Sequence, residues 1–112
     1  MLYQFAFYVP ETHLEAVKEA LFAAGAGRIG DYQRCAWQTL GQGQFEPLLA
    51  AQPFIGQVGQ RECLAEYKVE MVIDEAHLTA ALQAFFNTHP YEEPAYFLQV
   101  GLDARQICSV LD

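Results

Sequence analysis

Residues 89–96 (HPYEEPAY) bring together more side chains capable of chemistry than any other segment of the sequence. They place an imidazole, two carboxylates and two phenols within eight residues, and their two prolines favour extended backbone. His89 with Glu92 or Glu93 has the ligand types that hold a divalent metal ion. The same segment also fits a rigid loop between a helix and a strand. We favour the loop, because the spacing alone supplies too few metal ligands.

The pattern of residues gives catalysis no support. Glu92 and Glu93 are adjacent, so on extended backbone they point to opposite faces and do not form a general acid–base pair. The sequence contains no Ser-His-Asp, Cys-His, Walker or His-Glu-x-x-His arrangement. We therefore predict that the chain is not an enzyme. It has no certain cofactor, and a divalent metal ion is the candidate to test.

Residues 25–30 (GAGRIG) match the G-x-G-x-x-G string of dinucleotide sites, but their context argues against that function. Such a motif opens a helix, whose N-terminus binds the pyrophosphate, whereas here the glycines follow a helical pattern and lead into a strand. We interpret them as a turn, in which Arg28 could still meet an anion.

Glycine, proline and aromatic residues gather in segments outside the periodic elements. Residues 41–61 contain four glycines and two prolines and show no clear period, and irregular stretches of that length are typically functional, interfacial or disordered. We expect the neighbouring Phe54 and Ile55 to be buried against the fold or against another subunit. The candidate ligand-binding residues in these segments are Arg28, Asp31, Tyr32, Phe45, Phe54, Gly56, Tyr91 and Tyr96.

The composition and charge of the chain limit the kinds of molecule that we expect it to bind. The chain has 112 residues, 53% of them hydrophobic, which suits one domain spanning residues 1–112 with apolar surface to spare for an interface. Its net charge is −8, and its six lysines and arginines are scattered, so we expect no nucleic-acid partner. Three cysteines without a C-x-x-C spacing suggest buried free thiols in a reducing compartment. Without a signal-peptide pattern or a long apolar run, we expect a cytoplasmic protein with no membrane partner.

Hydrophobic periodicity predicts alternating strands and helices. Apolar residues at helical spacing follow a possible capping box formed by Thr12 and Glu15, and this helix should end at Gly25. Asp74 is placed to cap a second helix, which His89 should close because it precedes a proline. The expected strands cover residues 2–9, about 32–40, 65–73 and 95–100, with a turn at 41–43 and a possible short strand at 45–47. The tail at 102–112 fits either a short helix or an edge strand.

This β-α-β-β-α-β order predicts an α+β fold of the ferredoxin-like type. Right-handed crossovers place the strands in a four-stranded antiparallel sheet with both helices on one face. The other face is left uncovered, and another copy of the chain is the expected cover.

Five ordered segments resemble the inserted domain of the bacterial Nif-three-like proteins, the YqfO group. They are residues 9–13 (VPETH), 25–32 (GAGRIGDY), 41–47 (GQGQFEP), 53–56 (PFIG) and 89–96 (HPYEEPAY). In that family the insert is similar to the trimeric, ferredoxin-like signalling proteins of the PII and CutA type. The resemblance covers nearly the whole chain and agrees with the element order predicted from periodicity.

The resemblance implies a small, trimeric module in which clefts between subunits receive a small ligand. Residues 41–61 would occupy the position of the long signalling loop of PII proteins. The two-metal centre of the family lies in flanking domains whose histidine and acidic motifs are absent here, so we expect the insert standing alone, without hydrolase activity. The expected partners are further copies of the chain and a small molecule or protein; the alternative function is divalent-metal binding by His89 with Glu92 or Glu93.

Overall fold

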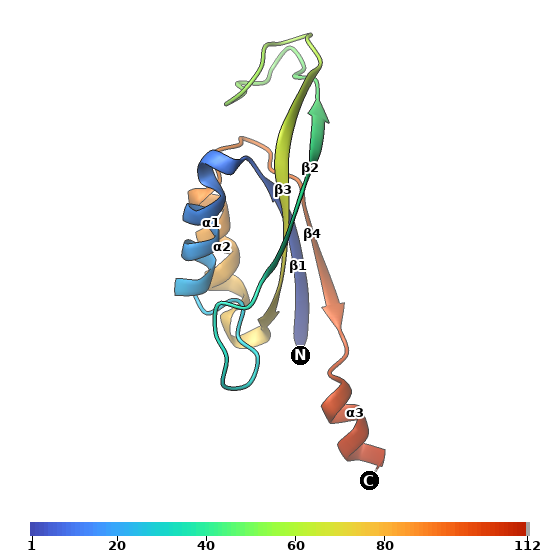
Figure 1. Ribbon diagram of the computed structural model, residues 1–112. Helices are drawn as coiled ribbons and strands as arrows, with labels where there is room; N and C mark the ends of the chain where they lie inside the picture. The colour runs from blue at the N-terminus through green and yellow to red at the C-terminus, as the bar shows by residue number, and fades with distance from the viewer. Residues whose placement is uncertain (112) are drawn as a thin grey trace.

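A computed structural model, which describes residues 1–111, contains one four-stranded sheet in the order β2-β3-β1-β4. Every neighbouring pair of strands is antiparallel, and α1 and α2 lie side by side on one face (Figure 1). The ferredoxin-like prediction is confirmed. The elements are β1 (Leu2–Val9), α1 (Glu11–Ala23), β2 (Trp37–Phe45), β3 (Glu62–Asp74), the 3₁₀ helix η1 (Glu75–His77), α2 (Leu78–Thr88), β4 (Tyr96–Gly101) and α3 (Ala104–Leu111).

The core lies between the central strands and the two helices. Phe5 and Phe7 of β1 are fully buried, and the ring of Phe85 from α2 packs against both, at centroid distances of 5.0 and 5.1 Å. Such tilted and edge-on ring pairs stabilise a core beyond the area they bury. The alternation predicted for β3 is confirmed, because Val69, Met71 and Ile73 are buried on this face. The helices contribute Leu14, Val17, Leu21, Ala81 and Phe85.

The two helices begin in different ways. The capping box predicted for α1 is wrong: the helix starts at Glu11 behind the extended Pro10, so Thr12 lies inside the first turn and contacts the ring of His13. The cap predicted for the second helix is confirmed. The Oδ1 atom of Asp74 accepts a hydrogen bond of 3.0 Å from the amide of His77 and holds η1, which continues into α2.

The predicted second strand is present with later bounds, and the turn predicted at residues 41–43 is wrong. β2 begins at Trp37 rather than near residue 32, and it runs through Gly41 and Gly43 to Phe45 in unbroken register with β3. A Cβ atom on Gly43 would collide with the carboxylate of Glu66. Glycine therefore serves close packing between strands here and does not mark a turn.

The β2–β3 hairpin at one end and α3 at the other make the molecule long (Figure 1). The hairpin extends well beyond the helical layer (Figure 1), and the chain measures 58 × 25 × 24 Å. The radius of gyration is 16.1 Å, whereas a compact domain of this length has about 13 Å. Much of the hairpin is consequently exposed to solvent in a single copy of the chain.

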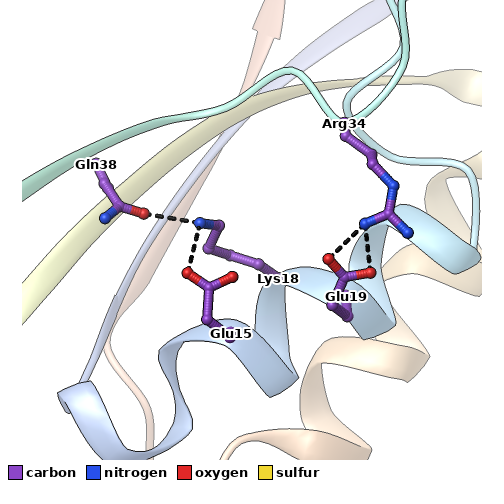
Figure 2. A network of polar contacts seen from close by, with 5 residues as sticks. All are labelled: Glu15, Lys18, Glu19, Arg34 and Gln38. Carbon is purple, nitrogen blue, oxygen red and sulfur yellow. Dashed lines mark hydrogen bonds and ion pairs between the residues drawn. The ribbon is translucent and has the colours of Figure 1, made fainter.

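Polar contacts attach both β2 and the segment that precedes it to α1 (Figure 2). The Nζ atom of Lys18 donates hydrogen bonds of 2.8 Å to Oε1 of Gln38 and 3.1 Å to Oε1 of Glu15. Arg34 forms an ion pair with Glu19 on the same helix. The Arg34–Glu19 pair holds residues 28–36 beside α1, where we had expected the start of a strand, and the Lys18–Gln38 contact holds the beginning of β2.

One of the two predictions for the tail is confirmed, and the prediction for the cysteines is wrong. Of the two alternatives for the tail, the helix is observed as α3, and Asp112 lies outside the described residues. The expectation of buried thiols is wrong, because Cys35 is half-buried and Cys63 and Cys108 are exposed. None of the helices within residues 1–111 has both the length and the apolar character needed to cross a bilayer.

We predict that Phe85→Ala lowers the free energy of unfolding by about 3–5 kcal/mol, because it leaves a cavity among fully buried rings. Urea denaturation followed by circular dichroism measures the change. Phe86→Ala, at the half-exposed neighbouring position, is the matched control and should cost about 1 kcal/mol or less. Equal losses in the two variants would contradict this account of the core.

Candidate functional site

A groove lies at the end of the molecule where the β2–β3 hairpin projects. Residues 45–55 form one wall and residues 91–93 the other, and together they enclose about 350 Å³. This volume lies within the range of small-molecule sites. We call this feature the tip groove.

Three aromatic side chains form the floor of the tip groove. The ring of Tyr91 lies 6.3 Å from that of Phe45 and 6.3 Å from that of Phe54, measured between centroids. Phe54 also makes an edge-on contact with His13 at 5.3 Å, which joins the long loop to the start of α1. The loop after β2 is thus folded back onto the body of the protein by ring contacts.

Hydrogen bonds fix Tyr91 in place. Its hydroxyl donates to Oε2 of Glu66 on β3 at 3.0 Å, and its backbone amide donates to Nδ1 of His89 at 3.1 Å. The other ring nitrogen of His89, Nε2, donates to the carbonyl oxygen of Tyr8 at 2.6 Å. Because one ring nitrogen accepts and the other donates, the contacts require the neutral imidazole protonated on Nε2.

The surroundings of these two residues favour their neutral forms. Burial lowers the pKa of His89, an effect only partly offset by its hydrogen bond to the Tyr8 carbonyl. Burial raises the pKa of Tyr91, and the neighbouring carboxylate of Glu66 raises it further. The phenol therefore stays protonated and able to donate throughout the neutral pH range.

Carboxylates surround the aromatic floor. Glu46, Glu92 and Glu93 line the tip groove, and its described lining includes no lysine or arginine. The Oε1 atom of Glu92 accepts a hydrogen bond of 3.2 Å from the amide of Gln52, which ties the two walls together. The groove thus combines an apolar floor with negative charge.

The structure divides the eight candidate ligand-binding residues among three places. Phe45, Phe54 and Tyr91 line the tip groove, and Gly56 lies beside it, with a positive φ and a position close to the ring of Phe45. Tyr96 instead packs against Phe5, Phe85 and Phe86 on the helix side of β4. Arg28, Asp31 and Tyr32 lie in the segment between α1 and β2, at the opposite end of the molecule (Figure 1).

Sequence reasoning missed two parts of the groove. The role of Glu66 was hidden, because its place in an alternating strand indicated only an exposed face. Pro47 is buried beside the groove, but it was missed because residues 41–61 show no hydrophobic periodicity that marks buried positions. The contact between Glu66 and Tyr91 cannot be predicted from local sequence, because the whole of α2 separates these two residues in the chain.

The residues proposed for a metal ion have other contacts. Both ring nitrogens of His89 are engaged, so a metal ion at this residue has to displace Tyr8 or Tyr91. Within residues 1–111, no three side chains of the His, Cys, Asp or Glu types are grouped to hold an ion.

Comparison with known proteins places this arrangement in a family context. A GTP cyclohydrolase 1 type 2 homolog from Halalkalibacterium halodurans is 43% identical over 97 residues, covering 87% of this chain and 26% of the relative. A Bacillus cereus protein related to NIF3 superposes with a TM-score of 0.75 at 35% identity, over 88% of this chain and 25% of that protein. The periplasmic divalent cation tolerance protein CutA from Archaeoglobus fulgidus matches with a TM-score of 0.65 at 12% identity, over 97% of this chain and 93% of the other. No family model matches.

The chain is therefore homologous to one segment of the NIF3-related proteins, and it spans about a quarter of the length of the curated relatives it matches. The resemblance to the Nif-three-like proteins is confirmed. The likeness to CutA, at low sequence identity, shows the fold alone and confirms the ferredoxin-like architecture.

We predict that the free energy of unfolding falls as the pH drops below about 6.5, the ordinary pKa of histidine. The pKa of His89 is lower in the folded protein than in the unfolded chain. As the pH falls, the unfolded chain therefore binds the proton first, which stabilises the unfolded state relative to the folded state. Urea denaturation at pH 7.5 and 5.5 measures the loss. His89→Gln should show a smaller loss over the same interval, and an equal loss in both proteins would refute the assignment.

Proposed function

We propose that this chain, related to a segment of the Nif-three-like proteins, is a homo-oligomeric module that binds a small ligand and performs no catalysis itself. The resemblance to PII and CutA proteins implies a trimer. The observation that carries the proposal is the sheet face without helices (Figure 1), which presents large aromatic side chains to solvent.

One row of side chains crosses all four strands of this uncovered face. Trp37 of β2 is paired with Glu70 of β3. Glu70 is paired with Ala6 of β1, which in turn is paired with Phe97 of β4. In a single copy of the chain, Trp37 is 70% exposed and Phe97 is 62% exposed. Large aromatic side chains are enriched in protein interfaces. A second copy packed on this face would remove both rings from water.

The edge strand supports the same proposal. All but one of the residues of β4 are exposed, and Leu98 and Val100 face the helix side without being covered by it. An unpaired apolar edge is an aggregation hazard that proteins normally cover. The projecting β2–β3 hairpin adds surface that a neighbouring copy can also use.

Two hollows are candidate ligand sites in such an assembly. The tip groove belongs to one chain. A second hollow, of about 570 Å³, lies over β2 and the middle of β3, beside the end of β1, and is lined by Tyr8, Thr39 and Lys68 among others. In the proposed oligomer a neighbouring copy encloses this second hollow, which matches the intersubunit cleft that the resemblance implies. The loop between β2 and β3 then takes the regulatory place of the PII signalling loop.

The activity named in the relatives belongs to proteins about four times as long as this chain. We propose that this segment contributes binding or assembly, and that the flanking parts of such proteins contribute any chemistry. A cytoplasmic location is part of the proposal and rests on the three free cysteines, which suit a reducing compartment.

A divalent-metal-binding function, using His89 with Glu92 or Glu93, is the second proposal. The segment that carries these residues motivates it, and the name of the structurally similar CutA protein refers to divalent cations. In this fold the ion has to compete with the amide of Tyr91 for Nδ1 of His89.

We predict that light scattering after size exclusion finds three times the mass of one chain at micromolar concentration. Trp37→Lys should shift the mass toward that of one chain, because it places a charge in the middle of the proposed interface. Phe86→Lys, at a half-exposed aromatic residue of α2 on the helical side of the sheet, is the matched control and should leave the mass unchanged. A wild-type protein that stays monomeric removes the oligomer.

Calorimetric titration with Zn²⁺, Mn²⁺ and Mg²⁺ tests the metal proposal. Binding through His89 predicts heat in the wild type that disappears in His89→Ala. Identical heats in the two proteins would exclude His89 as a ligand.

A further inference from the structure

The tip groove exposes apolar surface that the fold itself does not cover. Phe54 is 52% exposed although its ring already contacts His13 and Tyr91, and Leu48 is 77% exposed. Leaving these side chains in water costs free energy that a bound apolar group recovers. The groove is therefore shaped for a ligand with an apolar body.

The charged side chains that line the groove are all negative. Its lining carries the carboxylates of Glu46, Glu92 and Glu93, and only one of them, Glu92, has a recorded hydrogen bond within the described part of the chain. A ligand with a carboxylate or phosphate would meet repulsion here. A cation would be attracted by the carboxylates and by the faces of the aromatic rings.

We propose that the tip groove binds a small organic ammonium cation with an apolar body. The apolar body lies against Phe45, Phe54 and Tyr91, and the ammonium group lies among the carboxylates of Glu46, Glu92 and Glu93. Tyr91 is suited to this role because its hydroxyl is held by Glu66, which leaves the ring as the contact surface.

The proposal deepens and rests on the ligand-binding function proposed above, but not on the oligomer. All the groove residues come from one chain. The site is therefore complete in a monomer, and binding and assembly can be measured separately on the same sample.

The test is a ¹H–¹⁵N correlation titration of the wild-type protein with three probes at pH 8. The probes are 2-phenylethylammonium, neutral 2-phenylethanol and anionic 3-phenylpropanoate. The ammonium compound should shift the amides of residues 45–55 and 91–93. The alcohol should bind at least about fivefold more weakly, and the carboxylate more weakly still. Added NaCl should weaken the ammonium complex.

Matched variants test whether the carboxylates of Glu92 and Glu93 bind the ammonium group. Glu92→Gln combined with Glu93→Gln should weaken 2-phenylethylammonium about fivefold. The side-chain carbonyl that Glu92→Gln leaves in place can still accept from the backbone amide of Gln52, so the loop contact survives. Glu75→Gln, at an exposed position in η1, should leave the affinity unchanged.

Several results would overturn the proposal. They are equal affinity for the alcohol and the ammonium compound, shifts centred outside the groove, an unchanged affinity in the double variant, or the same shifts with MgCl₂ alone. Diffusion measurements on the same samples report the oligomeric state. A trimer that ignores the ammonium compound overturns this inference alone, whereas a monomer that binds it supports the inference and removes the oligomer.

Discussion

The buried imidazole of His89 is the contact on which the rest of the tip depends. It donates from Nε2 to the carbonyl of Tyr8 near the end of β1, and it accepts at Nδ1 from the amide of Tyr91. Only 7% of the residue is exposed. One ring thus joins the central strand to the segment that follows α2. Tyr91, held in this way, supports Phe45 and Phe54 and gives the long loop a surface to fold against.

The surface proposed for assembly and the groove proposed for ligand binding lie on different parts of the fold. Both helices cover one side of the sheet, so the aromatic row that includes Trp37 and Phe97 is left on the other side. The tip groove lies beyond the helical layer and uses residues of one chain. An oligomer formed through the uncovered face would leave the groove accessible.

The sequence predicted what local pattern determines and missed what distant contacts determine. A run of aromatic and apolar residues identified β1, alternation identified the buried face of β3, and Asp74 marked the start of the second helix. Gly41 and Gly43 of β2 indicated a turn because the side chain that lies against Gly43, Glu66, belongs to another strand. For the same reason the aromatic residues of the groove could be singled out by type, whereas Arg28, Asp31 and Tyr32 could not be assigned to the opposite end. Their position follows from contacts of this segment with distant residues, since Arg34 pairs with Glu19 of α1 and the amide of Cys35 donates to the carbonyl of Gly27.

Native-state hydrogen exchange on His89→Ala tests the central role of this imidazole most directly. The amides of Tyr91 and Gln52 donate to His89 and Glu92, respectively, so both should be protected in the wild type. Both should lose protection in the variant, because the segment that carries Tyr91 and Glu92 loses its attachment to β1 through His89, while the amides of β1 and β3 stay protected. A variant in which Gln52 keeps its full protection would show that the loop is organised without His89.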